Sequence, residues 1–354
     1  MGRIDLNGKT VLITGAAGFI GAALAERMLS DVSDIRIIGV DDMNDYYDPA
    51  LKRARLRRVE EAAQGSSAGG KFVFIEKSIT DREAMNDLFE AERPGIVVNL
   101  AAQAGVRYSV EAPYEFLDSN INGFFNILEC CRDFPVEHLV YASSSSVYGA
   151  NGKVPYSTED MTDSPVSLYA ATKKCNEVLA YAYSEMYGIP ATGLRFFTVY
   201  GPWGRPDMAY YLFAEKLAKG EKIQLYGYGK CERDFTYIDD IIEGVMRVAG
   251  SAPEAEGRGD AAARVYNIGN SEKTGLFDFV RTLCAELQRT GVLPEGFDPD
   301  EHIELAPLQT GDVPVTYADV SSLEQDFGFR PETELGDGLR KFCEWFAEYK
   351  GAAF

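Results

Sequence analysis

The first two thirds of the chain alternate short, continuous runs of apolar residues with longer segments in which apolar residues recur at helical spacing. A continuous apolar run of roughly four to eight residues is typical of a strand that helices cover on both faces, because neither face meets water. Alternation of such strands with helices indicates repeated βαβ units and a parallel sheet. The strands predicted in this way are Thr10–Thr14, Ile35–Val40, Phe72–Ile75, Ile96–Leu100, His138–Ala142 and Ala191–Phe196. The helices predicted between them are Gly18–Leu29, Pro49–Ala63, Asp81–Glu92, Ala112–Cys131 and Val166–Tyr187.

The pattern changes after about Thr198. Short strand candidates, Lys222–Tyr226 and Val265–Ile268, mix there with helices and turn-rich loops, among them a disordered-looking stretch at Gly250–Gly259. Because 354 residues exceed the usual size of one domain, we expect a second, smaller one. The predicted fold class is α/β, a Rossmann-type doubly wound parallel sheet with a smaller α+β substrate-binding domain. The expected boundaries are residues 1–197 for the sheet domain, to which segments near 235–270 return, and mainly residues 198–354 for the second domain.

The charge of the chain narrows the range of partners. A formal net charge of −20 argues against nucleic acid or an anionic membrane as a partner, because both are polyanions. The start of the chain is short and polar, and no apolar run approaches the roughly 18 residues that a membrane span needs. We therefore expect a cytoplasmic protein. With two histidines and no paired CxxC spacing, we expect no metal site.

The first predicted strand runs directly into a glycine-rich segment, GAAGFIG at 15–21, which opens the first predicted helix. Glycines at a strand-to-helix turn allow a tight turn and a close approach of backbone to a pyrophosphate, whose charge the helix N-terminus favours. The second strand is followed by Asp41, 20 residues after Gly21. A carboxylate there accepts the ribose hydroxyls of NAD and repels the extra phosphate of NADP. This segment therefore predicts an NAD site.

A phenol and an ammonium group lie four residues apart on one face of a predicted helix, at Tyr169 and Lys173. The phenol of a tyrosine ordinarily has a pKa of about 10, too high for a base at neutral pH, and a neighbouring positive charge favours the phenolate. Four serines at 143–146 follow the fifth strand, at the sheet edge where open α/β sheets bind ligands. A serine hydroxyl there can hold a reacting oxygen beside the tyrosine. Taken alone, Tyr169 and Lys173 are compatible with a contact on the surface of a helix, and the serines with a polar loop. Together, these residues predict a hydride-transfer site.

The GxxGxxG spacing, the segment NLAA at 99–102 and the order of Ser, Tyr and Lys resemble the extended branch of the short-chain dehydrogenase/reductase superfamily, from about Lys9 to Lys350. The resemblance implies that Tyr169 is the catalytic base, Lys173 its partner and Ser144 the catalytic serine. Sugar dehydratases of this branch carry Asp and Glu where this chain has Ser145 and Ser146, so dehydration is disfavoured. An aspartate commonly stands where this chain has Ser78, just before Ile79. The cofactor-binding residues implied are Gly15, Gly18, Phe19, Ile20, Gly21, Asp41, Ile79, Leu100, Ala101, Ala102, Tyr169 and Lys173.

The stretch LRFFTVYGPWGRPDMA at 194–209 resembles the UDP-glucuronate 4-epimerases within this branch, as do AAQAGVR at 101–107, DSN at 118–120 and GDVP at 311–314. The resemblance implies that Thr198, Arg205 and the serines surround a sugar carboxylate, which suits the planar fork of an arginine. The substrate-binding residues implied are Ser143, Ser144, Ser145, Thr198, Arg205, Arg233, Arg107 and Asp312. A surface arginine covering Trp203 is the alternative for Arg205. An ion pair with Asp234 or Asp239 is the alternative for Arg233.

The reaction implied is reversible epimerisation at carbon 4 of UDP-glucuronate to UDP-galacturonate, through a 4-keto intermediate and tightly bound NAD. The resemblance also implies a homodimer, formed through the helices predicted at Ala112–Cys131 and Val166–Tyr187, and a role in polysaccharide biosynthesis. Another UDP-sugar 4-epimerase and a UDP-glucuronate decarboxylase remain alternatives, although neither is expected to have FTVYGPWGRPDMA. A non-catalytic NAD-sensing module is a further alternative, and it is expected to lack the Tyr/Lys pair.

Overall fold

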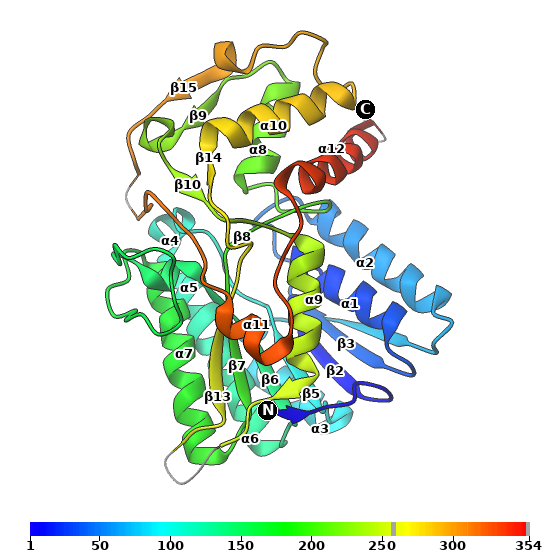
Figure 1. Ribbon diagram of the computed structural model, residues 1–354. Coiled ribbons are helices and arrows are strands. Elements are labelled where there is room, and N and C mark those ends of the chain that lie inside the picture. Colours follow the sequence, from blue (N-terminus) through cyan, green and yellow to red (C-terminus); the bar gives the residue numbers. More distant parts are fainter. Residues whose placement is uncertain (256–259, 310, 352–354) are drawn as a thin grey trace.

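A central sheet of seven parallel strands organises the computed structural model, which describes residues 1–255, 260–309 and 311–351 (Figure 1). The strand order is β4-β3-β2-β5-β6-β7-β13, so the winding direction reverses between β2 and β5. Open α/β sheets bind ligands at such a reversal, outside the carboxyl ends of the strands. The predicted doubly wound parallel sheet is confirmed. Its strands are β2 (Thr10–Thr14), β3 (Arg36–Asp41), β4 (Lys71–Glu76), β5 (Ile96–Asn99), β6 (His138–Ser144), β7 (Ala191–Phe196) and β13 (Ala263–Ile268).

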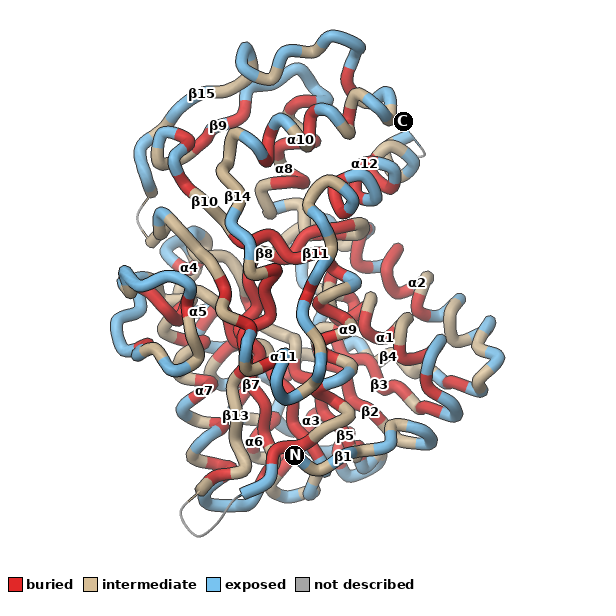
Figure 2. The backbone as a smooth tube through the Cα atoms, viewed as in Figure 1, coloured by how far each residue is buried: buried red, intermediate tan, exposed pale blue. Residues whose placement is uncertain are grey.

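Helices cover both faces of the sheet, which explains why its strands read as continuous apolar runs (Figures 1 and 2). In β2, Val11 and Ile13 belong to one hydrophobic cluster and Leu12 to the other, because successive side chains of a strand point to opposite faces. The helices of the first face are α1 (Phe19–Asp31), α2 (Pro49–Gly65) and α9 (Ile238–Ala249). Those of the second face are α3 (Arg82–Glu92), α6 (Phe124–Asp133) and α7 (Leu168–Tyr187).

The predicted elements of the sheet domain agree with the structure to within about two residues at their ends, with one exception. The helix predicted at Ala112–Cys131 is wrong as a single α-helix, because it consists of α5 (Pro113–Phe116), the π-helical segment η1 (Leu117–Gly123) and α6. The wide π turn buries the Asn120 side chain, which donates hydrogen bonds to the Gln103 carbonyl and the Thr172 hydroxyl. Such π segments frequently mark functional sites.

The strand predicted at Val265–Ile268 is present as part of β13, which pairs with β7 at the edge of the large sheet, within the segments near 235–270 that are expected to return to the sheet domain. One prediction beyond residue 198 needs correction. Within the stretch predicted to be disordered, Gly250–Gly259, Ser251–Ala252 forms the short strand β12, which pairs with β1 (Gly2–Arg3). Residues 256–259 lie outside the part of the chain that the structure describes.

A smaller layer lies over the carboxyl edge of the sheet and contains short strand pairs and helices (Figure 1). Its strand pairs are β8 (Thr198–Tyr200) with β11 (Phe235–Tyr237), β9 (Ile223–Leu225) with β15 (Ile303–Leu305), and β10 (Glu232–Arg233) with β14 (Thr274–Gly275). Its helices are α8 (Ala209–Ala218), α10 (Leu276–Arg289) and α12 (Leu335–Gly351). Shorter helical segments of the chain are α4 (Tyr108–Glu111), η2 (Ser145–Tyr148), η3 (Tyr226–Gly229), η4 (Pro299–His302) and α11 (Ser321–Phe327).

A cavity of about 790 Å³ lies between the sheet edge and the smaller layer. Its wall includes the glycine-rich turn after β2, the serines after β6 and the loop around Arg205. The fold therefore brings the separate motifs of the sequence to one space. Among the described residues, no helix has the length and apolar character needed to cross a membrane.

Candidate active site

The glycine-rich turn between β2 and α1 is packed too closely for side chains. Gly15 has a φ of +70°, and a Cβ atom on it would lie 2.9 Å from the Ala101 backbone nitrogen. A Cβ atom on Gly21 would lie 2.1 Å from the Gly15 carbonyl oxygen. Gly18 caps α1 without a side-chain hydrogen bond, so the first N–H groups of the helix stay available to an anion. This cradle fits the pyrophosphate of a dinucleotide.

Asp41, at the end of β3, lies beside this cradle and lines the cavity. Its carboxylate accepts hydrogen bonds from the backbone N–H groups of Ala17 at 3.1 Å and Met43 at 2.9 Å. Burial raises the pKa of Asp41, while the ammonium group of the buried Lys52, 3.7 Å away, opposes the rise. Sequence reasoning missed Lys52, because it comes from the facing turn of α2. The other residues of the predicted cofactor set from the sheet edge also line the cavity, namely Ile79, Leu100, Ala101 and Ala102.

Tyr169 and Ser144 meet in the cavity. Ser144 ends β6, and its hydroxyl accepts a hydrogen bond from the Ser146 N–H at 3.1 Å, which caps η2. Tyr169 lies in the first turn of α7, which Ser167 caps by accepting from the Ala170 N–H. Burial raises the pKa of the Tyr169 phenol, and a hydrogen bond with Ser144 and the positive charge of Arg205 oppose that rise. The serine and the arginine predicted from separate motifs therefore both act on the predicted base.

Lys173 follows Tyr169 by one helical turn and is buried. Its ammonium group donates a 2.9 Å hydrogen bond to the Ala142 carbonyl on β6. Burial lowers the pKa of Lys173 to about 8. Tyr169 and Lys173 thus lie on one helix face, as predicted. The hydrogen bond to Ala142 also fixes the position of the Lys173 ammonium group, which the spacing alone does not reveal.

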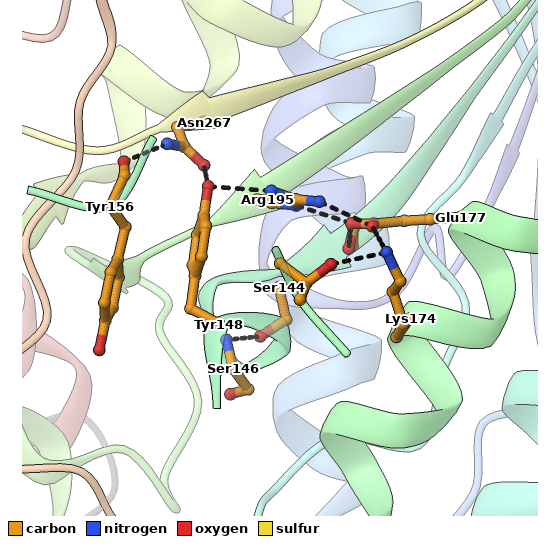
Figure 3. Close-up of polar contacts among 10 residues, drawn as sticks. Ser144, Ser146, Tyr148, Tyr156, Lys174, Glu177, Arg195 and Asn267 are labelled. Carbon is orange, nitrogen blue, oxygen red and sulfur yellow. Dashed lines mark hydrogen bonds and ion pairs between the residues drawn. The ribbon is translucent and has the colours of Figure 1, made fainter. Parts of the chain in front are cut away.

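A buried polar network lies behind the serines (Figure 3). Glu177 on α7 accepts two hydrogen bonds of 2.8 Å from the Arg195 guanidinium on β7 and one of 2.6 Å from the Ser143 hydroxyl. The Arg195 guanidinium also donates to the Tyr148 hydroxyl, which donates to the Asn267 side-chain oxygen. Ser143, predicted to bind substrate, therefore has its hydroxyl engaged by Glu177.

Sequence reasoning missed Glu177 and Arg195 as parts of this site. The available signals were Glu177 one turn beyond Lys173 and a charged residue, Arg195, inside an otherwise apolar strand. A charge within a doubly covered strand requires a buried partner.

Arg205 belongs to the loop between β8 and α8. Its guanidinium holds the Asp207 carboxylate through Nε at 3.0 Å and Nη2 at 2.6 Å, and Asp207 also accepts from the Tyr46 hydroxyl at 3.2 Å. Among the described residues, the guanidinium that lies over the Trp203 ring is that of Arg58 and not that of Arg205. The Arg205 fork thus already binds a carboxylate at the cavity wall.

The remaining predicted arginines also line the cavity. Arg107 lies over the Tyr226 ring, with its guanidinium carbon 4.5 Å from the ring centroid, and forms an ion pair of 3.3 Å with Asp312. Arg233 donates hydrogen bonds to the carbonyl oxygens of Glu232 and Pro314. The ion pair with Asp234 or Asp239 considered for Arg233 is not found among the described residues, and Asp234 instead accepts from the backbone of Asn270, Ser271 and Ala318.

Thr198 and Ser145 complete the predicted set on the cavity wall. The arrangement provides an anion cradle at one end, a serine–tyrosine–lysine group in the middle and an arginine fork beside it. Chemically, it can hold a dinucleotide against a second, anionic ligand and move a proton at the Tyr169 oxygen.

Comparisons with known proteins agree with this geometry. The model of the NAD dependent epimerase/dehydratase family matches residues 11–269. Protein CapI of Staphylococcus aureus is 45% identical over an alignment of 350 residues that covers 96% of this chain and 98% of that protein. UDP-glucuronate 4-epimerase 4 of Arabidopsis thaliana is 44% identical over 352 residues, which cover 97% of this chain and 76% of that protein. The crystal structure of UDP-glucuronic acid 4-epimerase from Bacillus cereus, in complex with UDP-glucuronic acid and NAD, has a TM-score of 0.81 at 29% identity, covering 96% of this chain and 99% of that one.

Proposed function

Because this chain belongs to the NAD dependent epimerase/dehydratase family, we propose that it is an NAD-dependent enzyme that interconverts UDP-glucuronate and UDP-galacturonate by epimerisation at carbon 4. The observation that carries the proposal is that Arg205 and Tyr169 line the same cavity, where the arginine charge opposes the rise in the pKa of the phenol that burial causes. A fork for a carboxylate thus faces the same space as a base for a hydroxyl. A uronic acid presents both groups on one ring.

The residues divide the reaction between them. When bound, NAD supplies the acceptor for the hydride of carbon 4 and later its donor. Tyr169 takes the proton of the carbon-4 hydroxyl, Ser144 holds that oxygen, and the positive charge of Lys173 favours the phenolate. Carbon 4 becomes a ketone as it loses the hydride. The keto sugar then rotates in the cavity and presents its opposite face. Tyr169 returns the proton to the oxygen while the hydride reaches that face of carbon 4.

The keto sugar of a uronate is a β-keto acid, which is prone to lose carbon dioxide. In that loss the bond between carbon 5 and the carboxylate breaks, and its electron pair enters the ketone as an enolate that then takes a proton. Arg205 and Thr198 oppose this step by holding the carboxylate near the plane of the ring, where the breaking bond overlaps poorly with the ketone. Asp207 occupies the Nε and Nη2 edge of the Arg205 guanidinium, so in this proposal the sugar carboxylate binds the Nη1 side or replaces Asp207.

We assign the rest of the site by the same reasoning. Residues 1–197, with the returning segments near 235–270, bind NAD, and residues 198–354 bind mainly the nucleotide sugar. Arg107 and Arg233 face the diphosphate. Ser143 is a supporting residue in this proposal, because its hydroxyl is held by Glu177.

We also propose that two copies of the chain pair through α6 and α7. The outer faces of these helices expose large apolar side chains, with Val178 56% and Tyr181 53% exposed. Phe125 and Met186 extend the same exposed set. Several exposed apolar side chains on two neighbouring helices of a charged protein are typical of an interface between subunits.

The test of the function is incubation of the purified protein with UDP-glucuronate, without added NAD, followed by proton NMR. The proposal predicts UDP-galacturonate without release of carbon dioxide. Formation of a UDP-pentose would instead identify a decarboxylase. Conversion of UDP-glucose but not of UDP-glucuronate would overturn the carboxylate assignment and leave the Ser144–Tyr169–Lys173 chemistry in place.

A further inference from the structure

Arg55, on α2, is a buried arginine that the proposed reaction does not use. Its side chain is 1% exposed. Among the described residues, no carboxylate forms an ion pair with it, and its partners are instead three carbonyl oxygens and one phenol. Nε donates to the Trp203 carbonyl at 2.9 Å, and Nη2 donates to the Gly204 carbonyl at 2.9 Å. Nη1 donates to the Ala17 carbonyl at 3.2 Å and to the Tyr47 hydroxyl at 2.6 Å.

A buried charge without a counter-ion is costly unless its hydrogen bonds are satisfied, and these four contacts satisfy the Arg55 guanidinium while they join separate loops. Two of the three carbonyl groups belong to the residues immediately before Arg205. Trp203 has a φ of +62°, which is uncommon for a residue other than glycine and requires support from its surroundings. A Cβ atom on Gly204 would lie 1.7 Å from the Tyr210 hydroxyl, so this backbone is also confined on its other side.

The third carbonyl group belongs to the dinucleotide cradle. Ala17 donates its N–H to Asp41 and accepts from Arg55 through its carbonyl. One residue, Ala17, therefore separates the carboxylate proposed to bind the ribose of NAD from the Arg55 guanidinium. Arg55 then continues to Gly204, the neighbour of Arg205. This path of hydrogen bonds runs from the cofactor end of the cavity to the carboxylate end.

We propose that Arg55 is a positioning residue that clamps the Trp203–Gly204 backbone to the dinucleotide cradle and so holds Arg205 where it selects substrates with a carboxylate. The inference rests on the proposed function and deepens it. The planar guanidinium of arginine donates to three carbonyl groups in fixed directions. The ammonium group of lysine, on a shorter side chain, cannot make the same three contacts. Substitution of Arg55 by lysine keeps the charge and loses the geometry.

The experiment measures binding rather than turnover. Tyr169→Phe removes the base, so UDP-glucuronate and UDP-glucose can both be titrated calorimetrically against an inactive protein with its retained NAD. In that background, Arg55→Lys is expected to lower the preference for UDP-glucuronate over UDP-glucose about tenfold, while the affinity for UDP-glucose changes by less than about twofold. Arg57→Lys, at an exposed position on the same helix, is the matched control and leaves both affinities unchanged.

The ratio of two affinities measured on one preparation does not depend on the folded fraction, so a partial loss of stability does not imitate the effect. If Arg55→Lys does not fold, Tyr47→Phe removes a single partner of Arg55 and is expected to lower the preference about threefold. An unchanged preference in the folded variant overturns the inference, as does an equal loss of affinity for both ligands. If the protein with Arg55 intact shows no preference for UDP-glucuronate, the proposed function fails and this inference fails with it.

Discussion

Glu177 and Arg195 form a buried, two-point ion pair directly behind the serine segment, with both N···O distances at 2.8 Å. The pair connects α7, which carries Tyr169 and Lys173, to β7, which leads to Thr198. Because Glu177 also accepts from Ser143 on β6, one carboxylate sets the relative position of three elements of the site.

The pair gives a prediction about stability. Glu177→Gln leaves the Arg195 charge buried without a counter-ion, and we expect the free energy of unfolding to fall by about 3 kcal/mol, measured by urea denaturation. As the control, Glu137→Gln removes an exposed partner of Lys9 and is expected to cost less than about 1 kcal/mol. Equal losses in the two variants would show that the buried pair contributes no more than a surface one.

A second prediction concerns the pH dependence of turnover. The Lys173 charge favours the Tyr169 phenolate, so its removal in Lys173→Met raises the pKa of the phenol further. Since turnover requires the phenolate, the acidic limb of the kcat profile moves to higher pH, and kcat at pH 7 falls on the order of 100-fold. Steady-state rates between pH 6 and 10 measure both effects. A uniform loss at every pH would contradict an electrostatic role.

The same lysine gives a prediction about stability against pH. Its pKa is about 8 in the folded protein and about 10.5 in an unfolded chain, so between these values the unfolded chain binds more protons. Stability therefore rises with pH across this window. Relative to Lys173→Met, the protein stripped of NAD should gain about 2 kcal/mol of unfolding free energy between pH 7 and pH 9.5. The contributions of the other titrating groups cancel when the free energies of unfolding of the two proteins are subtracted. If that difference in free energy does not change with pH, the prediction is refuted.

A third residue, Arg205, is predicted to govern both affinity and the fate of the intermediate. Arg205→Met removes the cation proposed to bind the sugar carboxylate, and kcat/KM for UDP-glucuronate should fall about 100-fold, as expected for a lost charged hydrogen bond. A share of turnovers should then release carbon dioxide, because the carboxylate is no longer held near the ring plane. Trapped carbon dioxide and NMR of the products quantify that share. If the variant turns over without releasing carbon dioxide, groups other than Arg205 protect the keto intermediate from decarboxylation.

The last prediction concerns subunit association. Tyr181→Glu places a charge on the exposed apolar face of α7, and it should convert the proposed dimer to a monomer at micromolar concentration. Analytical ultracentrifugation measures the mass of each species. Glu185→Gln, another substitution at an exposed position of α7, should leave the mass unchanged. A variant that sediments like the original protein would move the interface elsewhere.

Local features of the site could be predicted from the sequence, because a few neighbouring residues determine them. The apolar run of β2 and the glycines that follow it specify a buried strand and a tight turn at which no side chain fits. The spacing of Tyr169 and Lys173 specifies a shared helix face, since helical geometry brings residues four apart together.

Only the tertiary structure decided which side chains become partners across long stretches of chain. Glu177 and Arg195 meet because α7 packs where β6 and β7 lie side by side. The π turn around Asn120 and the contacts of Arg55 with two separate loops likewise depend on how whole elements pack. Apolar periodicity specifies which face of an element is buried, but a polar side chain buried by that packing takes whichever partner the neighbouring element supplies.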